Sequence, residues 1–406
     1  MGSLLGWVDF EEKERNQMME VIKMMREQDT RDELGIGVIR DAFSDMLFPG
    51  TSTIQTRAKY MLFVPWLYRN HERKKTPSAE IAAKARRDEM RLCNALLKSE
   101  DTEGVIGKEA GSKLQRLPSN VYWSGLRRWG IRYFPGSHEE YHQFLNNFYI
   151  RQASQIIGDD REPVEGPLKE NWDPNLPECP AGFPDEATLK LFQHEAEYLK
   201  EKIMKYCSQT VLAHLVTSTA DPADCNYIWE HPQLHDFPDF NKTQIKYARS
   251  FSLFIHGAFL LYNYMLAYYC KREDLIEKYQ DMLQEWATEI MDSPELFYGW
   301  QGQEFWEVVE TQIGYIPPPV YRFVNDWLQI VFEEADPFNV ISNQSAWDLI
   351  RNREIRLKKT KRARLANDRA LELWTGASGI RRLDFRWNET KRIVNDILEG
   401  LNPKED

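Results

Sequence analysis

The feature that most constrains the fold is a long uncharged stretch from Ser250 to Cys270, which lies between Arg249 and Lys271. As a helix, this stretch has roughly the length needed to cross a bilayer. It also carries polar side chains, among them His256 and Asn263, which make insertion into lipid unfavourable. A helix through the middle of a large helical domain is apolar all round. We therefore predict a buried core helix and no membrane contact, with His256 as a satisfied core residue and not a ligand.

Helical signals follow one another along the chain, and strand-like alternation is scarce. Asp9 and Glu12 form a capping box ahead of a helix, and a short amphipathic helix over 38–47 is stopped by Pro49. Thr51 or Ser52 can cap a longer helix. Further helices are expected at 185–206, 209–219, 241–272, 273–291, 303–313, 318–335, 344–375 and 388–400. The expected fold is mainly α and multi-helical.

The chain has 406 residues, more than one hydrophobic core usually holds. A stretch rich in proline and acidic residues, and poor in helical periodicity, separates two helical parts. We predict an N-terminal helical domain over 1–157, a Pro-rich acidic connection over 158–184, and a C-terminal helical domain over 185–406.

Charge and cysteine content narrow the class of protein. The net charge of −11 argues against indiscriminate coating of DNA, but it leaves room for a local basic patch. The five cysteines form no C-x-x-C pair, so neither a disulfide framework nor a zinc ribbon is supported. The N-terminus has no signal-peptide pattern. A cytoplasmic location fits these features best.

The segment 104–136 has the parts of a helix-turn-helix with a wing. A short helix near Val105, a turn at Pro118, a second helix from Val121 and a β-like arm follow in order. Arg127 and Arg128 stand between two tryptophans on the second helix, as suits contact with phosphates and bases. The alternative is an ordinary helical hairpin with two core tryptophans and surface arginines.

A basic run over 351–364 contains eight Lys or Arg and one Glu, and more basic residues follow to position 392. Such a concentration of charge in an acidic chain is typical of phosphate binding. The candidate phosphate contacts are Lys358, Lys359, Lys361, Arg362 and Arg364, with Arg127 and Arg128 secondary. The alternative is a solvated helix face that pairs with carboxylates elsewhere in the chain.

His138, Glu139 and His142 match the H-E-x-x-H pattern of zinc hydrolases. Ser137 and Glu140 form a capping box, so His138 would be the first residue of its helix and not part of a rigid metal site. The short glycine turns at Gly35 and Gly376 do not extend to a nucleotide-binding motif. We expect no metal, no cofactor and no catalytic set, which favours a protein that is not an enzyme.

Several blocks of sequence resemble a known family. They are 6–10, 31–43 with 48–52, 55–57 and 63–66, then 121–126 with 129–131, and finally 364–374 with 383–387. The resemblance is to a bacterial domain-of-unknown-function family (number six-three-six-one) and covers nearly the whole chain. It implies an accessory protein of mobile or anti-phage defence clusters, encoded beside helicases and nucleases, and it carries no catalytic residues over.

The leading hypothesis is a non-enzymatic, nucleic-acid-binding accessory or adaptor protein that acts with a helicase or nuclease in anti-phage defence, with DNA favoured over RNA. The first alternative is a protein–protein scaffold, for which Trp300, Trp306, Trp327, Trp347 and Trp374 are candidate anchors. The second is a zinc-dependent hydrolase built on His138, Glu139 and His142.

Overall fold

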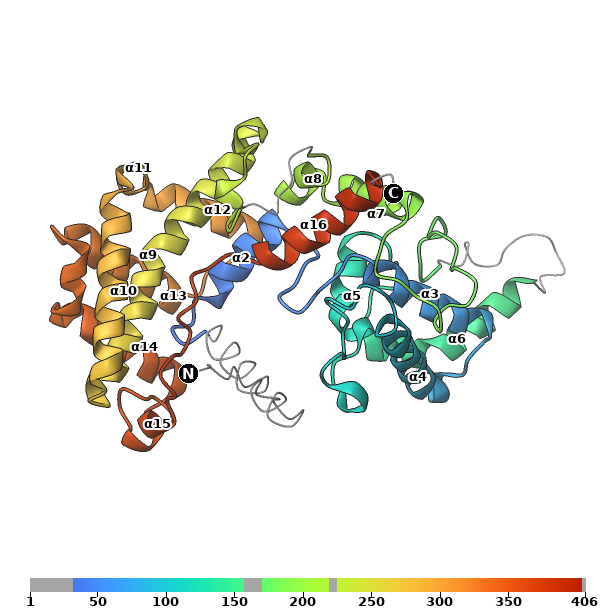
Figure 1. Ribbon diagram of the computed structural model, residues 1–406, viewed down its shortest axis with the longest axis horizontal. Coiled ribbons are helices and arrows are strands. Elements are labelled where there is room, and N and C mark those ends of the chain that lie inside the picture. Colours follow the sequence, from blue (N-terminus) through green and yellow to red (C-terminus); the bar gives the residue numbers. More distant parts are fainter. Residues whose placement is uncertain (1–31, 157–169, 219–224, 404–406) are drawn as a thin grey trace, which may run out of the picture. The chain divides into compact units, whose positions relative to one another are not determined.

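The computed structural model describes residues 32–156, 170–218 and 225–403 (Figure 1). Over these residues the secondary structure consists of α-helices and short 3₁₀ helices, so the mainly α prediction is confirmed. The β-type pairing found there is an isolated antiparallel bridge between Arg132 and Trp172. The capping box expected at Asp9 and Glu12 lies outside the described residues.

The chain forms two compact units, each built from segments far apart in the sequence. The first unit comprises the chain up to Phe43 together with 246–383, and the second comprises 44–245 together with 384–406. The chain therefore passes between the units three times. This division differs from the predicted one, in which a single connection at 158–184 separates two sequential domains.

The described part of the predicted connection, 170–184, belongs to the second unit and packs into it. Trp172 is 2% exposed, and its indole Nε1–H donates to the hydroxyl of Tyr141 at 3.1 Å. Asp173 is fully buried, where its carboxylate accepts a hydrogen bond from Tyr198 at 2.8 Å and pairs with Lys202. The prolines therefore mark an irregular segment that covers the unit, not a linker.

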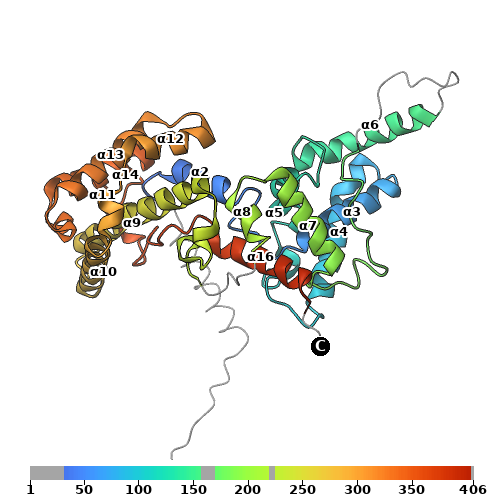
Figure 2. The same ribbon diagram turned by 90° about the horizontal axis from the view of Figure 1, so that it is seen from above.

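The first unit is centred on helix α9 (Asp239–Tyr269). Around it lie α10 (Glu273–Met291), α11 (Pro294–Tyr298), α12 (Gly302–Ile313), α13 (Pro318–Glu333), α14 (Gln344–Lys358) and α15 (Asp368–Glu372), joined by the 3₁₀ helix η5 (Pro337–Ile341). Helix α2 (Gly37–Leu47) begins in this unit. Both ribbon views show α10 running beside α9 (Figures 1 and 2).

Helix α9 is long and apolar enough to cross a membrane, but 89% of its most apolar window is buried inside the protein. Trp286 and Trp327 pack against it and donate their indole N–H groups to the carbonyls of Leu253 and Phe254, at 2.8 and 2.9 Å. Burial lowers the pKa of His256 to about 4, and its Nε2 lies 3.1 Å from the carbonyl oxygen of Ile380. The predicted core helix is confirmed, and His256 is half-buried with a backbone carbonyl as its partner.

The second unit contains most of the remaining helices. They are α3 (Tyr60–Arg73), α4 (Ser78–Leu96), α5 (Pro118–Arg128), α6 (His138–Ile156), α7 (Gln193–Tyr206), α8 (Val211–Leu215) and α16 (Trp387–Leu401), with short 3₁₀ turns between them. Helix α3 packs on α4 and α5, and α16 lies along α7 (Figure 2). Distant parts of the chain thus complete this unit.

A buried carboxylate holds α16 in place within the second unit. Asp396 accepts hydrogen bonds from Arg57 Nε at 2.9 Å and from the backbone N–H of Ala58 at 2.7 Å. Burial raises the pKa of Asp396 to about 6, although Arg57 favours its charged form. The C-terminal helix is therefore fixed by a partner more than 300 residues earlier in the chain.

Most helix positions were predictable, and the errors concern starts and breaks. The prediction of 273–291 matches α10, and that of 38–47 is one residue short of α2. The helix expected after Thr51 begins only at Tyr60, and the one expected from 185 begins at Gln193. The prediction of one long helix over 344–375 was wrong, because the observed helix ends at Lys358 and a separate short helix, α15, follows.

Gly257 of α9 lies directly against the indole of Trp286 on α10. A Cβ at this position would stand 2.2 Å from the ring of Trp286. We expect Gly257→Ala to lower the free energy of unfolding by about 1–3 kcal/mol, because overpacking outweighs the higher helix propensity of alanine. Urea unfolding measures the change, with Gly302→Ala, which meets nothing closer than 3.7 Å, as the control. An unchanged midpoint for Gly257→Ala would contradict the close packing.

Candidate nucleic-acid interface

The basic run begins inside α14, whose ends explain its position. Asn343 caps the N-terminus by accepting a hydrogen bond from the backbone N–H of Ala346 at 3.1 Å. Arg356 and Lys358 lie in the last turn, where cations are favoured by the helix dipole. The residue that follows the helix, Lys359, has φ 63° and ψ 155°. This backbone region is essentially restricted to glycine and costs about 1–3 kcal/mol for other residues.

One cation of the run, Arg353, is buried and serves the fold. Its side chain is 5% exposed and donates to the carbonyls of Leu34, Gly35 and Pro319, at 2.7 to 2.8 Å. The guanidinium also lies 5.0 Å from the ring centre of Phe323. Arg353 thus ties the segment before α2 to α13 and α14, and it is not available to a ligand.

A buried acid–base network takes up two more cations. Glu354 is fully buried and pairs with Lys358 at 2.8 Å, while Glu33, 7% exposed, pairs with Lys358 and, at 3.0 Å, with Arg364. The hydroxyl of Tyr262 donates to Glu354 at 2.6 Å and accepts from Lys358 and Arg364. We call these five residues the Glu33–Glu354 network.

The same network fixes the chain that follows α14. The carboxylate of Glu354 accepts hydrogen bonds from the backbone N–H groups of Arg364 and Leu365, at 3.0 and 2.9 Å. The side chains of Ala363 and Leu365 are buried. Glu354 therefore binds the backbone ten and eleven residues after itself. These hydrogen bonds explain why the helix predicted to be continuous breaks.

The charge state of the network follows from its partners. Burial alone would raise the pKa of Glu33, but hydrogen bonds from Lys358 and Ser378, and the charges of Lys358 and Arg364, outweigh it and lower the pKa to about 2. Burial, with the neighbouring carboxylates of Glu354 and Glu33, raises the pKa of Tyr262 far above its usual value. At neutral pH the Glu33 carboxylate is therefore ionised and the Tyr262 phenol is neutral.

The remaining cations of the run face outward. Lys359, Lys361 and Arg362 are exposed and have no carboxylate at ion-pair distance among the described residues. We call residues 359–362 the basic loop. The sequence expectation that five cations stand free therefore holds for these three, whereas Lys358 and Arg364 are neutralised inside the protein. Other exposed cations of the segment are Arg351, Arg356 and Arg369.

Three basic residues after Arg369 have carboxylate partners. Arg382 pairs with Glu289 at 2.8 Å in the first unit. Arg386 and Arg392 belong to the second unit, where they pair with Asp45 at 2.6 Å and with Glu103 at 2.8 Å. The predicted basic segment over 351–392 is thus divided between two units, and three of its later members are paired with carboxylates.

An exposed aromatic cluster, which the sequence reasoning missed, lies at the other end of α14. Tyr268 and Tyr269 are 53% and 43% exposed, and their ring centres lie 5.5 and 6.1 Å from that of Trp347. A signal existed in the sequence, because two adjacent tyrosines end the apolar helix and are followed, after Cys270, by Lys271 and Arg272. We call Tyr268, Tyr269 and Trp347 the aromatic cluster.

The secondary candidates, Arg127 and Arg128, lie exposed in the last turn of α5, but the motif around them is not a winged helix. Residues 104–114 form turns and a single 3₁₀ turn, η1 (Gly111–Lys113), in place of the expected first helix. The arm makes one bridge at Arg132 and no hairpin. The alternative of buried tryptophans beside surface arginines describes this segment better.

The tryptophans and the arm of this segment belong to the core. Trp123 is 6% exposed and Trp129 fully buried, and the indole N–H of Trp129 donates to the carbonyl of Pro49 at 2.8 Å. Arg132 is 3% exposed and stacks on Trp123 at 4.3 Å from its ring centre. Its burial lowers the pKa of Arg132 to about 10. The stacking partners that the sequence assigned to bases are already used within the protein.

The H-E-x-x-H match does not form a metal site. The capping box is confirmed, since Ser137 N–H donates to Glu140 at 2.6 Å and α6 begins at His138. His138 and His142 both direct Nε2 at the hydroxyl of Tyr68, and burial lowers the pKa of His138 to about 3. Within the described ranges, no group of three or more His, Cys, Asp or Glu side chains is placed to hold a metal ion.

The tryptophans proposed as docking anchors are mainly core residues. Trp306, Trp327 and Trp374 are at most 6% exposed, and the indole N–H of Trp306 donates to Asn325 at 3.0 Å. Trp300 and Trp347 are half-buried. An anchor that reaches a partner must project from the surface. Three of the five candidates, Trp306, Trp327 and Trp374, do not project from the surface.

The comparisons with known proteins place this architecture in a family. The model of a family of unknown function (DUF6361) matches residues 2–400. The chain belongs to that family. The resemblance noted in the sequence blocks is therefore confirmed over nearly the whole length, and it transfers no chemistry, because the description names no activity. No curated protein and no solved structure matches the chain.

The Glu33–Glu354 network leads to a prediction about how the stability of the protein depends on pH. The lowered pKa of Glu33 means that its stabilising effect is complete above the unfolded value of 4.5 and is lost as the pH falls toward about 2. We expect Glu33→Gln to lower the free energy of unfolding at pH 7 by on the order of 2–3 kcal/mol. The difference from the unmodified protein should shrink between pH 4.5 and pH 3.

Urea unfolding of both proteins at pH 7, 4.5 and 3 measures this difference. Glu285→Gln removes an exposed carboxylate of the same unit and serves as the control, with little effect expected at any pH. A difference that is absent at pH 7, or that grows as the solution becomes more acidic, would show that Glu33 is not the anchor of the network.

Proposed function

We propose that this protein is a non-enzymatic nucleic-acid-binding accessory protein whose basic loop contacts backbone phosphates. The observation that carries the proposal is the division of the basic run into two sets. Lys358 and Arg364 are bound inside the Glu33–Glu354 network, which anchors the chain on either side of the loop. Lys359, Lys361 and Arg362 are thereby presented to solvent on a fixed backbone.

The aromatic cluster supports a single strand as the form of nucleic acid. Helices α9 and α14 run antiparallel, because Tyr262 meets Lys358 while Tyr268 and Tyr269 meet Trp347. From Trp347 to Lys358 the rise along α14 is about 16 Å. This span corresponds to several nucleotides at about 3.4 Å per residue of one strand.

Cations that follow a backbone, beside aromatic rings on which bases stack, are typical of proteins that bind single strands without sequence preference. Arg351 is exposed one helical turn from Trp347 and lies between the aromatic cluster and the basic loop along α14. In this arrangement the basic loop and Arg351 contact phosphates, and Tyr268 and Tyr269 stack on unpaired bases.

The wider role in this proposal comes from the family resemblance. We propose DNA ahead of RNA as the ligand, and an adaptor role beside a helicase or nuclease in anti-phage defence. A helicase produces single strands, so a non-enzymatic protein that holds one is chemically compatible with such a partner. The scaffold alternative is not proposed, because its candidate anchors lie largely in the core.

The basic loop is tested by neutralising its three cations together. We expect Lys359→Gln/Lys361→Gln/Arg362→Gln to weaken binding of a fluorescent single-stranded DNA and to reduce the slope of log K against log salt by about 2, since each lost phosphate contact contributes about 0.7. Anisotropy titrations at several salt concentrations measure both effects, with RNA and duplex DNA of the same sequence in parallel.

The matched control is Lys246→Gln/Lys278→Gln/Arg322→Gln, which removes the same charge from exposed positions of the first unit outside the run. Its affinity and salt slope should stay close to those of the unmodified protein. If both triple variants lost the same affinity, the effect would come from net charge and not from the basic loop. An absence of binding to any of the three nucleic acids at low salt would end the proposal.

The aromatic cluster is tested by a double substitution that leaves the charge unchanged. We expect Tyr268→Ala/Tyr269→Ala to weaken single-strand binding by about 1–3 kcal/mol per stacked base, with the salt slope unchanged. The control is Tyr298→Ala/Tyr315→Ala, which removes rings that are 81% and 67% exposed in the same unit. Full affinity in the Tyr268→Ala/Tyr269→Ala variant would leave phosphate contact as the only mode of binding.

A further inference from the structure

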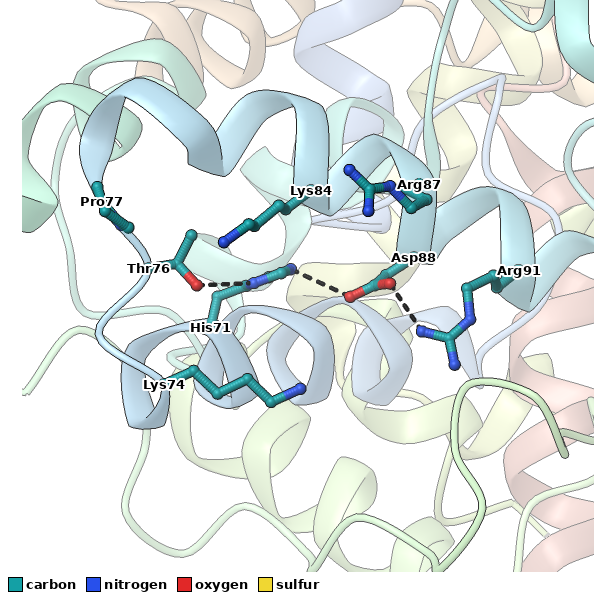
Figure 3. A pocket seen from close by; sticks show the side chains of 8 residues that line it. All are labelled: His71, Lys74, Thr76, Pro77, Lys84, Arg87, Asp88 and Arg91. Atoms are coloured by element: carbon teal, nitrogen blue, oxygen red, sulfur yellow. Dashed lines mark hydrogen bonds and ion pairs between the residues drawn. The ribbon is translucent and has the colours of Figure 1, made fainter.

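A cavity of about 270 Å³ opens on the second unit, between the end of α3 and the side of α4 (Figure 3). Most of its wall is basic. The charged and titratable side chains that line it are His71, Lys74, Lys84, Arg87, Asp88 and Arg91. Four of these carry a permanent positive charge and one a negative charge, in a protein that is acidic overall. An excess of cations around one cavity favours an anionic ligand.

The negative charge in the wall is already satisfied. Asp88 lies 3.3 Å from His71 Nε2 and 2.9 Å from the guanidinium of Arg91, and Arg91 also pairs with Asp185. The hydrogen bond from His71, followed by that from Arg91, lowers the pKa of Asp88. His71, Asp88, Arg91 and Asp185 are thus paired with one another, so Arg91 is a structural residue here.

The other three cations are available to a ligand. Lys74 and Arg87 are exposed and have no carboxylate at ion-pair distance in the described part of the chain. Lys84 pairs with Glu80 at 2.7 Å, but both side chains are well exposed, and such surface pairs are worth little. Figure 3 shows Lys84 and Arg87 reaching from α4, and Lys74 from the end of α3, around His71 and Asp88.

The start of α4 adds to the positive electrostatic potential in the cavity. Thr76 and Pro77 line the cavity, and α4 begins at the next residue and continues to Leu96. The N-terminal end of a helix of this length carries a partial positive charge that favours anions. The helix end supplements the three side-chain cations and does not define the site.

We propose that this cavity binds a phosphate monoester through Lys74, Lys84 and Arg87. A doubly charged anion matches a cavity lined by three available cations better than a carboxylate does, and a guanidinium can contact two phosphate oxygens at once. The volume lies just below the range usual for sites of drug-sized ligands, so it fits a phosphate with the group next to it and not a large molecule. We call it the phosphate pocket.

The phosphate can come from a free nucleotide or from the 5′ end of a nucleic acid, and both present the same chemistry to the pocket. The inference goes beyond the proposed function, because its residues belong to the second unit and none of them is part of the basic loop. Failure of either proposal therefore leaves the other standing.

The test is calorimetric titration of the full chain with inorganic phosphate, adenosine 5′-monophosphate and adenosine. We expect saturable binding of the first two and none of adenosine. Lys74→Gln/Arg87→Gln should weaken binding of the monophosphate at least about tenfold, since hydrogen bonds between charged groups are the strong ones. The matched control Lys98→Gln/Arg116→Gln neutralises one exposed lysine and one exposed arginine outside the pocket and should leave the affinity unchanged.

A short oligonucleotide with a 5′-phosphate or a 5′-hydroxyl distinguishes the two sources. Tighter binding of the phosphorylated strand than of the monophosphate, lost in Lys74→Gln/Arg87→Gln, assigns the pocket to nucleic-acid ends, and equal affinity assigns it to free nucleotides. Circular dichroism verifies that both double variants are folded. No saturable binding of phosphate or monophosphate, or the same affinity in the two double variants, overturns the proposal.

Discussion

The first unit depends on a buried carboxylate, Glu354, that binds both a side chain of its own helix and the backbone beyond the end of that helix. Ionised groups are costly to bury unless they are paired and fully hydrogen-bonded. Glu354 meets this condition through Tyr262, Lys358 and two backbone N–H groups. Glu33 balances the remaining charge of Lys358 and Arg364. Removing one partner of such a network leaves an uncompensated buried charge, which is strongly destabilising.

Sequence patterns predicted what is determined locally. The uncharged stretch after Arg249 identified the core helix, and the Ser137–Glu140 capping box located the start of α6. What failed depends on contacts between residues far apart in the chain. Nothing near Lys358 or Arg364 indicates that Glu33, more than 300 residues away, neutralises them, and a count of local charge treats all members of the run alike.

Aromatic residues show the same limit. A tryptophan that anchors an interface and one that fills a core have the same sequence signature, and three of the five candidate anchors are core residues. The predicted domain boundary differs from the division into two compact units for a related reason. Prolines and acids between 158 and 184 indicate an absence of helix, but they do not tell whether the chain crosses open solvent or covers a core, as Trp172 and Asp173 do.

The buried part of the run also bears on how the exposed part would bind. A flexible basic tail loses conformational entropy when it engages a polyanion, whereas cations on a fixed backbone have already lost most of it. Lys359 has a backbone conformation that glycine tolerates and lysine does not favour, and it keeps that conformation between α14 and the residues held by Glu354. A lysine at such a position contributes a charge that glycine would lack. Strain of this kind is usual where function and not stability determines the residue, and this supports the basic loop as the surface to test first.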